Sequence, residues 1–259
     1  MHGDTGEFNW VESNWENMKH KRVILRTIGQ NTPRLEAKLQ QFKNEGLQIV
    51  RYSPKEANIP NFAGEDAIIR FYKDPEEFKD WNPQGKEMIT FAQNMIERGE
   101  FCHFDVYSRI ADGLNSHVYG PKNELAGPLN GGLLTYEQMK QKYRDGGVYF
   151  YTGTQPASYT LNFIEAWMTG IPIISIGNKI WNSLNLAGDV FEVPELLGND
   201  PNYPAGYFSN DMTELKIYVD KILNDPVKAK LVGDIGRKRA IELFGMPTIM
   251  EKWRQFLFI

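Results

Sequence analysis

Residues 149–177, YFYTGTQPASYTLNFIEAWMTGIPIISIG, carry the most regular pattern in the chain. The β-branched and aromatic runs at the two ends are typical of buried strands, and the segment 158–169 between them is typical of a helix. Pro156 precedes this helix and Gly170 follows it, as expected at helix boundaries. The stretch therefore predicts a strand, a polar turn, a helix and a second strand, which is a βαβ unit of a parallel sheet.

The same alternation continues on both sides of this unit. Short β-branched runs are separated by longer stretches of helical period, which excludes an all-α or an all-β protein. The polar stretch 74–85, with two prolines and a glycine, is typical of a connection between lobes. We therefore predict an α/β fold with a small N-terminal lobe, 1–84, and a C-terminal lobe with a helical tail, 85–259. Further strands are predicted at 22–28, 47–52, 67–71, 87–92 and 116–119, and helices at 34–45, 105–111, 136–143 and beyond residue 211.

Composition excludes several classes of protein. The 259 residues are 41% hydrophobic and 24% charged, as in ordinary globular chains. The net charge of −4 provides no general attraction for nucleic acid, which is therefore not an expected partner. Cys102 is the only cysteine and cannot form an intrachain disulfide, the first 15 residues lack the apolar run of a signal peptide, and no segment approaches about 20 apolar residues. We expect a cytoplasmic protein without a membrane span.

Common catalytic motifs are missing. The sequence contains no GxxxxGK[ST] loop, no GxGxxG after a strand, no HExxH and no GxSxG. Kinases, dehydrogenases, metalloproteases and serine hydrolases thereby lose their main sequence support. None of the four histidines has metal-ligand spacing from another, so no metal site is expected; His103 and His117 are candidate bases, but lone histidines more often have a structural role.

The turn after residue 151 is the best candidate for a binding site. Ligands of open parallel sheets bind beyond the carboxyl ends of the strands, which places Gly153 to Leu161 in the crevice. The free N–H groups of the first helical turn, near Ser158, and the positive end of the helix dipole favour a phosphate. Glu165, in an otherwise apolar stretch of the helix, can accept two hydrogen bonds from the hydroxyls of a ribose.

The segment 156–174, PASYTLNFIEAWMTGIPII, resembles the donor-binding segment of the retaining nucleotide-sugar glycosyltransferases of group 1, which have the GT-B fold. Their pattern runs Glu-x-Phe-Gly-Leu, then Glu-Ala, then Gly-x-Pro. The resemblance implies two Rossmann-like lobes with parallel sheets, here with a reduced N-terminal lobe. It also implies that Glu165 binds the donor ribose and that the backbone of Tyr159, Thr160 and Leu161 meets the diphosphate and sugar.

The sequence departs from the family pattern at two positions. Ala157 replaces the first glutamate, which contacts the transferred sugar, and Thr160 replaces the glycine. Family members also neutralise the diphosphate with an arginine and a lysine after the first strand of the C-terminal lobe. Here that region is 92–100, AQNMIERGE, in which the resemblance places Asn94 and Arg98 as the catalytic candidates. Gly131 and Gly132 resemble the segment whose backbone meets the nucleotide base.

The resemblance predicts a glycosyltransferase that moves a sugar from a nucleotide-diphosphate sugar to an unknown acceptor, expected to be a saccharide. Retention of configuration and independence from metal ions and cofactors are implied only by the resemblance. The alternative is a non-catalytic nucleotide-sugar or carbohydrate-binding protein, which Ala157 and the short first lobe favour. A homo-oligomer or a partner that completes this lobe is compatible with either hypothesis. The structural alternatives are a solvated helix face for Glu165 and ordinary surface positions for Arg98 and Asn94.

Overall fold

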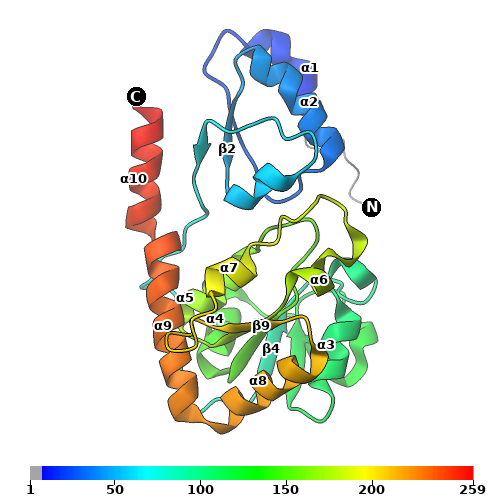
Figure 1. The fold of residues 1–259 in the computed structure, drawn as a ribbon, viewed down its shortest axis with the longest axis vertical. Coiled ribbons are helices and arrows are strands. Elements are labelled where there is room, and N and C mark those ends of the chain that lie inside the picture. Colours follow the sequence, from blue (N-terminus) through cyan, green and yellow to red (C-terminus); the bar gives the residue numbers. More distant parts are fainter. Residues whose placement is uncertain (1–7, 259) are drawn as a thin grey trace.

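The computed structural model describes residues 8–258, which form two lobes around two parallel sheets (Figure 1). The first sheet has three strands in the order β1-β2-β3, and the second has six in the order β6-β5-β4-β7-β8-β9. All neighbouring strands are parallel, which confirms the α/β prediction. The strands are β1 (Ile24–Arg26), β2 (Gln48–Arg51), β3 (Ala67–Ile68), β4 (Met88–Phe91), β5 (Ser116–Tyr119), β6 (Asn130–Gly132), β7 (Val148–Tyr151), β8 (Ile173–Ile176) and β9 (Tyr207–Ser209).

Helices cover both sheets. They are α1 (Phe8–Met18), α2 (Pro33–Asn44), α3 (Phe104–Ala111), α4 (Tyr136–Asp145), α5 (Leu161–Thr169), α6 (Asn178–Trp181), α7 (Val193–Leu197), α8 (Met212–Asn224), α9 (Pro226–Phe244) and α10 (Met246–Leu257), with short 3-10 turns η1 (Pro54–Asn58), η2 (Gly99–Phe101), η3 (Glu124–Leu129) and η4 (Asn182–Leu184). Within residues 8–258, no helix is both long enough and apolar enough to cross a membrane.

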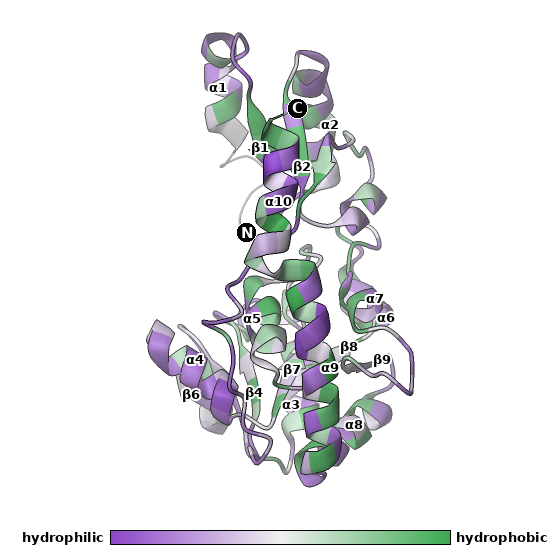
Figure 2. Cartoon of the chain, turned by 90° about the vertical axis from the view of Figure 1, so that its left-hand side faces the viewer, coloured by the Kyte–Doolittle hydropathy of each residue, from purple (hydrophilic) through white to green (hydrophobic). Residues whose placement is uncertain are grey.

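The first sheet is buried between helices on its two faces. Neighbouring residues of a strand point to opposite faces, so Ile49 and Val50 of β2 belong to different hydrophobic clusters. The Ile49 cluster lies under α1 and α2 and contains Trp15, Leu39, Phe42, Leu47 and Ala63. The Val50 cluster lies under α10 and contains Ile69, Ile249 and Phe256. The last helix of the chain therefore packs on the first lobe, as Figure 2 shows with α10 in front of β1 and β2.

Two segments of the chain connect the lobes, and these segments are in contact with each other. One is the connector that follows β3, and the other is the junction of α9 and α10, which together form a column along one side of both lobes (Figure 1). The Lys73 amide donates to the Phe244 carbonyl at 3.0 Å, and Lys73 forms a parallel bridge with Gly245. Strand β3 ends at Ile68, although the sequence predicted a strand over 67–71, and the chain pairs again only at Lys73. The predicted boundary at 84/85 stays a prediction.

The second lobe has strands that are buried on both faces. All residues of β7 and β8 are buried, which explains their continuous apolar sequence. Helix α5 packs closely on α9, where a side chain at Gly236 would come within 2.6 Å of the Trp167 indole nitrogen. That nitrogen donates to the Ala205 carbonyl at 2.8 Å. The glycine is therefore needed for the close approach of the two helices.

The sequence predicted that this helix begins at residue 158. In the structure, helix α5 begins at Leu161. The amide of Ser158 donates to the Tyr52 hydroxyl at 2.6 Å, and the amide of Thr160 donates to the Tyr151 hydroxyl at 3.0 Å. These contacts hold residues 158–160 outside the helix, and Thr160 is the extended N-cap residue. The other boundaries agree closely with the sequence, and β5 coincides with the predicted strand 116–119. The short strands β6 and β9 and helix α1 were not predicted.

A buried ion pair fixes the geometry of the first lobe. Arg51 donates to both carboxylate oxygens of Glu36, at 2.6 and 2.8 Å, and both residues are fully buried. The Asn31 side chain and the Ala63 amide also donate to this carboxylate, at 2.6 and 2.9 Å. The pair thereby joins α2, β2 and the loop before β3, and its loss leaves a buried charge without a partner.

Glu36→Gln is expected to lower the free energy of unfolding by about 3–5 kcal/mol, because the Arg51 guanidinium stays buried without a counter-charge. Urea unfolding followed by circular dichroism measures this change. Lys230→Met, which removes an exposed ion pair with Asp234 on α9, is the control and is expected to change stability by less than about 0.5 kcal/mol. Equal effects of the two substitutions would contradict a stabilising role for the buried pair.

Candidate functional site

The order of the second sheet contains one switch point, at which the direction of the connections reverses. Strands β4 and β7 are neighbours at the centre, and the chain leaves β4 toward β5 on one side and β7 toward β8 on the other. The loops beyond their carboxyl ends therefore diverge, which is the usual position of a ligand in such a sheet. Asn94 and Arg98 follow β4, whereas Tyr159, Thr160 and Leu161 follow β7. The structure thus brings the two predicted groups to the same edge of the sheet.

The first turn of α5 is open at this edge. No side chain caps it, and within residues 8–258 the amides of Leu161, Asn162 and Phe163 have no hydrogen-bond acceptor. Leu161 is 43% exposed, so solvent reaches this end of the helix. The expected role of the Ser158 amide needs correction, because that amide donates to Tyr52 inside packed protein. The amides that remain for an anion are those of the three residues that begin the helix.

Arg98 is a cationic residue in the segment that follows β4. It precedes η2, it is half-buried, and within residues 8–258 its guanidinium makes no hydrogen bond or ion pair. The carbonyl of Phe101 in η2 accepts from the Gln155 amide at 2.9 Å, and the Cys102 sulfur lies 3.8 Å from the Thr154 hydroxyl. The segment that carries Arg98 therefore packs against the turn that leads into α5.

Asn94 lies in the loop that follows β4. Its backbone has a φ of 51°, and its side-chain nitrogen donates to the Glu97 carboxylate at 2.7 Å. The side-chain oxygen is buried and has no partner within the described residues. The side-chain nitrogen has two N–H donors, of which the Glu97 contact uses one. The predicted catalytic role of Asn94 stays a prediction.

Glu165 lies one turn into α5 and is not a solvated surface residue. Its side chain is almost completely buried, one oxygen pairs with the Lys73 ammonium, and the other accepts from the Tyr143 hydroxyl at 3.2 Å. Burial raises the pKa of Glu165, and the contacts with Lys73 and Tyr143 oppose this shift. Burial also raises the pKa of Tyr143 well above its usual range, which keeps its hydroxyl a donor. The carboxylate is therefore held in one position by groups from two other elements.

Gly131 and Gly132 lie on the edge strand β6. The ring of Tyr119 in β5 occupies the space beside Gly131, where a Cβ would come within 2.3 Å of the ring. Gly132 has a φ of 82°, and its carbonyl accepts from the Gly120 amide at 3.0 Å. Both glycines are half-buried at the same edge of the sheet as the start of α5. Their predicted contact with a nucleotide base stays a prediction.

Buried polar contacts close the junction between the lobes beside this site. The Tyr159 hydroxyl donates to the Tyr52 carbonyl at 2.6 Å. The Arg70 guanidinium pairs with Glu192, and the Ser53 hydroxyl donates to the same carboxylate at 2.6 Å. Ala157 packs nearby, 3.0 Å from where a Cβ on Gly29 would stand. The first lobe thus fills the space beside the position at which the resemblance expects a sugar-binding glutamate.

The sequence did not predict four important residues, namely Tyr52, Arg70, Lys73 and Glu192. They join the lobes or hold Glu165, and each contacts a partner far away in the sequence. The one available signal was the basic pair Arg70 and Lys73, located just before the connector. Basic residues at such a position are too common to indicate these contacts.

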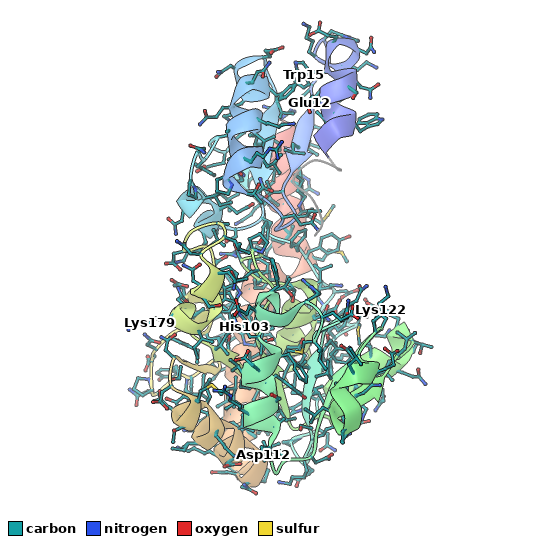
Figure 3. All side chains as sticks on the ribbon, turned by 90° about the vertical axis from the view of Figure 1, so that its right-hand side faces the viewer. Glu12, Trp15, His103, Asp112, Lys122 and Lys179 are labelled. Atoms are coloured by element: carbon teal, nitrogen blue, oxygen red, sulfur yellow. The ribbon has the colours of Figure 1, made fainter. Side chains whose placement is uncertain are left out.

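The two histidines that could act as bases have structural partners. His103 is buried at the end of α3 that is nearer the first lobe (Figure 3), and its Nε2 lies 3.1 Å from the Trp181 carbonyl. Burial lowers the pKa of His103. His117 Nδ1 lies 2.7 Å from a carboxylate oxygen of Glu87. Neither contact suggests a catalytic base.

Comparison of the sequence with models of protein families and with curated proteins gives no match. Solved structures do match. HepE from Anabaena, in complex with UDP and glucose, has a TM-score of 0.70 at 13% identity over 95% of this chain and 73% of its own. Sucrose-phosphate synthase from Thermosynechococcus elongatus has a TM-score of 0.70 at 14% identity over 96% of this chain and 71% of its own. TarM from S. aureus has a TM-score of 0.55 at 17% identity over 98% of this chain and 48% of its own. The chain therefore has the two-lobed GT-B fold of these glycosyltransferases, as the resemblance implied.

Proposed function

We propose that this protein is a glycosyltransferase whose donor is a nucleotide-diphosphate sugar, bound with its diphosphate at the first turn of α5. The observation that carries the proposal is the open helix terminus at the carboxyl edge of the sheet, with Arg98 unpaired in the adjacent segment. The fold supports it, because HepE, which shares this fold, has been solved with UDP and with UDP-glucose. A match at 13% identity establishes the fold only, and the nucleotide-sugar donor is our proposal.

The proposed diphosphate would meet groups that complement its charge. The amides of Leu161, Asn162 and Phe163 can donate to its oxygens, and the positive end of the helix dipole favours an anion there. A leaving diphosphate gains negative charge as the glycosidic bond breaks, and the Arg98 guanidinium can stabilise that charge. We propose that these groups do the work of a metal ion.

The ribose and the acceptor complete the proposal. Glu165, one turn beyond the free amides, is proposed to accept from the ribose hydroxyls. The departing diphosphate oxygen can take the proton of the attacking hydroxyl, so this scheme needs no separate base. Retention of configuration and a saccharide acceptor are part of the proposal and follow from the resemblance alone.

A second candidate function is binding without catalysis. Ala157 stands where the family has its sugar-contacting glutamate, and it packs against Gly29 of the first lobe. A protein that binds a nucleotide sugar through α5 and Glu165, but does not transfer it, would have this arrangement. The two functions share the donor site and differ in turnover.

Arg98→Ala is expected to weaken UDP binding by about tenfold to a hundredfold, because it removes the unpaired cation proposed to contact the diphosphate. Isothermal titration calorimetry with UDP, and with GDP and ADP to identify the base, measures this loss. Arg109→Ala on α3 is the control, because Arg109 is exposed and, like Arg98, makes no ion pair within residues 8–258; this variant should bind like the unchanged protein. No binding of any of the three nucleotides would overturn the proposed function.

Incubation with UDP-glucose is expected to release UDP, slowly through hydrolysis and faster with a suitable saccharide. Arg98→Ala is expected to lower kcat/KM by about a hundredfold, because the leaving group loses charge stabilisation. A coupled assay for UDP measures the rate. Donor binding without any release of UDP, for every saccharide tried, would favour the non-catalytic function.

A further inference from the structure

Both the backbone and the side-chain ammonium of Lys73 make specific contacts. Its backbone joins the two segments that connect the lobes, through the Phe244 carbonyl and the bridge to Gly245. Its side chain enters the second lobe, where the ammonium pairs with Glu165 and lies 5.4 Å from the centre of the Phe78 ring. The Lys73 side chain is only 17% exposed. A long cationic side chain is therefore held at a defined position beside the carboxylate that is proposed to bind ribose.

Several ionisable groups lie near Glu165 in the described part of the chain, and the positively charged one among them is Lys73. The connector also contributes Glu77, α4 contributes Tyr136 and Tyr143, and β7 contributes Tyr149. Burial and the negative charge of Glu77 favour the protonated acid, whereas Lys73 and the Tyr143 hydroxyl favour the carboxylate. Glu77 itself pairs with Lys140 at 3.2 Å, which reduces its effect. Burial has the largest effect on the pKa of Glu165, and Lys73 is the main group that opposes it and favours the carboxylate.

The arrangement leaves the right number of acceptor positions for a ribose. A carboxylate has about four lone-pair positions on its two oxygens. Lys73 occupies one position on one oxygen, and Tyr143 occupies one on the other. By this count each oxygen keeps one lone pair that neither contact uses, and two neighbouring hydroxyls need the same number of acceptors. A protonated Glu165 would lose this match, because one of its oxygens would become a donor.

We propose that Lys73 is a positioning residue for donor binding, which orients Glu165 and keeps it ionised so that the carboxylate accepts both ribose hydroxyls. This inference rests on the proposed donor site. Lys73 does not touch the donor and acts only through Glu165. It also connects the donor site directly to the crossing between the lobes.

The test is UDP affinity between pH 5.5 and 9 for the unchanged protein and for Lys73→Met. The terminal phosphate of UDP titrates at about pH 6, so the profile of the unchanged protein is the reference, and the ratio of the two affinities at each pH isolates Glu165. In Lys73→Met the acid form of Glu165 persists to higher pH, so UDP affinity relative to the unchanged protein should fall as pH falls, by about tenfold for each unit below the pKa. Lys73→Arg, which restores the charge, should recover most of the affinity and the pH profile of the unchanged protein.

Inorganic pyrophosphate separates the ribose contact from the phosphate contact. It lacks a ribose, so Lys73→Met should bind pyrophosphate like the unchanged protein. Lys79→Met, on the same connector but paired with exposed Glu76, is the matched control for both probes. Lys73→Gln, which removes the charge but can still donate to Glu165, provides a second variant if the methionine variant unfolds, and should show the same pH dependence.

The outcomes distinguish the inference from the proposed function. UDP binding that is lost in Arg98→Ala but keeps the affinity and pH profile of the unchanged protein in Lys73→Met would overturn the inference and leave the proposed function intact. Tighter UDP binding in Lys73→Met would also overturn it, because Lys73 would then block the ribose position. A failure of UDP, GDP and ADP to bind the unchanged protein would overturn both.

Discussion

The six-stranded parallel sheet of the second lobe is the constraint on which the rest of the molecule depends. Because every strand runs in the same direction, all carboxyl ends lie at one edge, and the diverging connections after β4 and β7 leave a crevice there. The start of α5 must lie in this crevice. Two tyrosine hydroxyls accept from the amides of Ser158 and Thr160, which fixes the turn, and the next three amides have no hydrogen-bond acceptor within residues 8–258. An external acceptor is the remaining way to satisfy them.

The junction between the lobes is built largely from buried polar contacts. Tyr52 and Tyr159 exchange hydrogen bonds with the facing backbone, and the Arg70–Glu192 pair lies beside them. Such contacts are directional, so they define one relative position of the lobes more sharply than apolar packing does. The crossing of the connector with the α9–α10 junction lies at one side of this interface. The shape of the candidate site therefore depends on both lobes.

The two departures from the glycosyltransferase pattern have different physical meanings. Thr160 replaces a glycine but has a φ of −113°, which any residue adopts, so its backbone carries no strain. Its amide is directed to Tyr151, and the free amides begin one residue later. Ala157 is different, because its side chain carries no carboxylate and packs against Gly29 of the first lobe. The first departure is compatible with donor binding, whereas the second changes the surroundings of the sugar.

The sequence by itself determined the α/β class, most strands and helices, the GT-B resemblance and the importance of the segment 149–177. These features follow from local patterns, namely hydrophobic period, glycine and proline positions, and residue spacing. Only the tertiary structure decided that α5 begins at Leu161, that Lys73 holds Glu165, and that Ala157 packs against Gly29. It also decided that α10 belongs to the core of the first lobe. Each of these depends on side chains brought together from distant parts of the chain, and no local pattern carries that information.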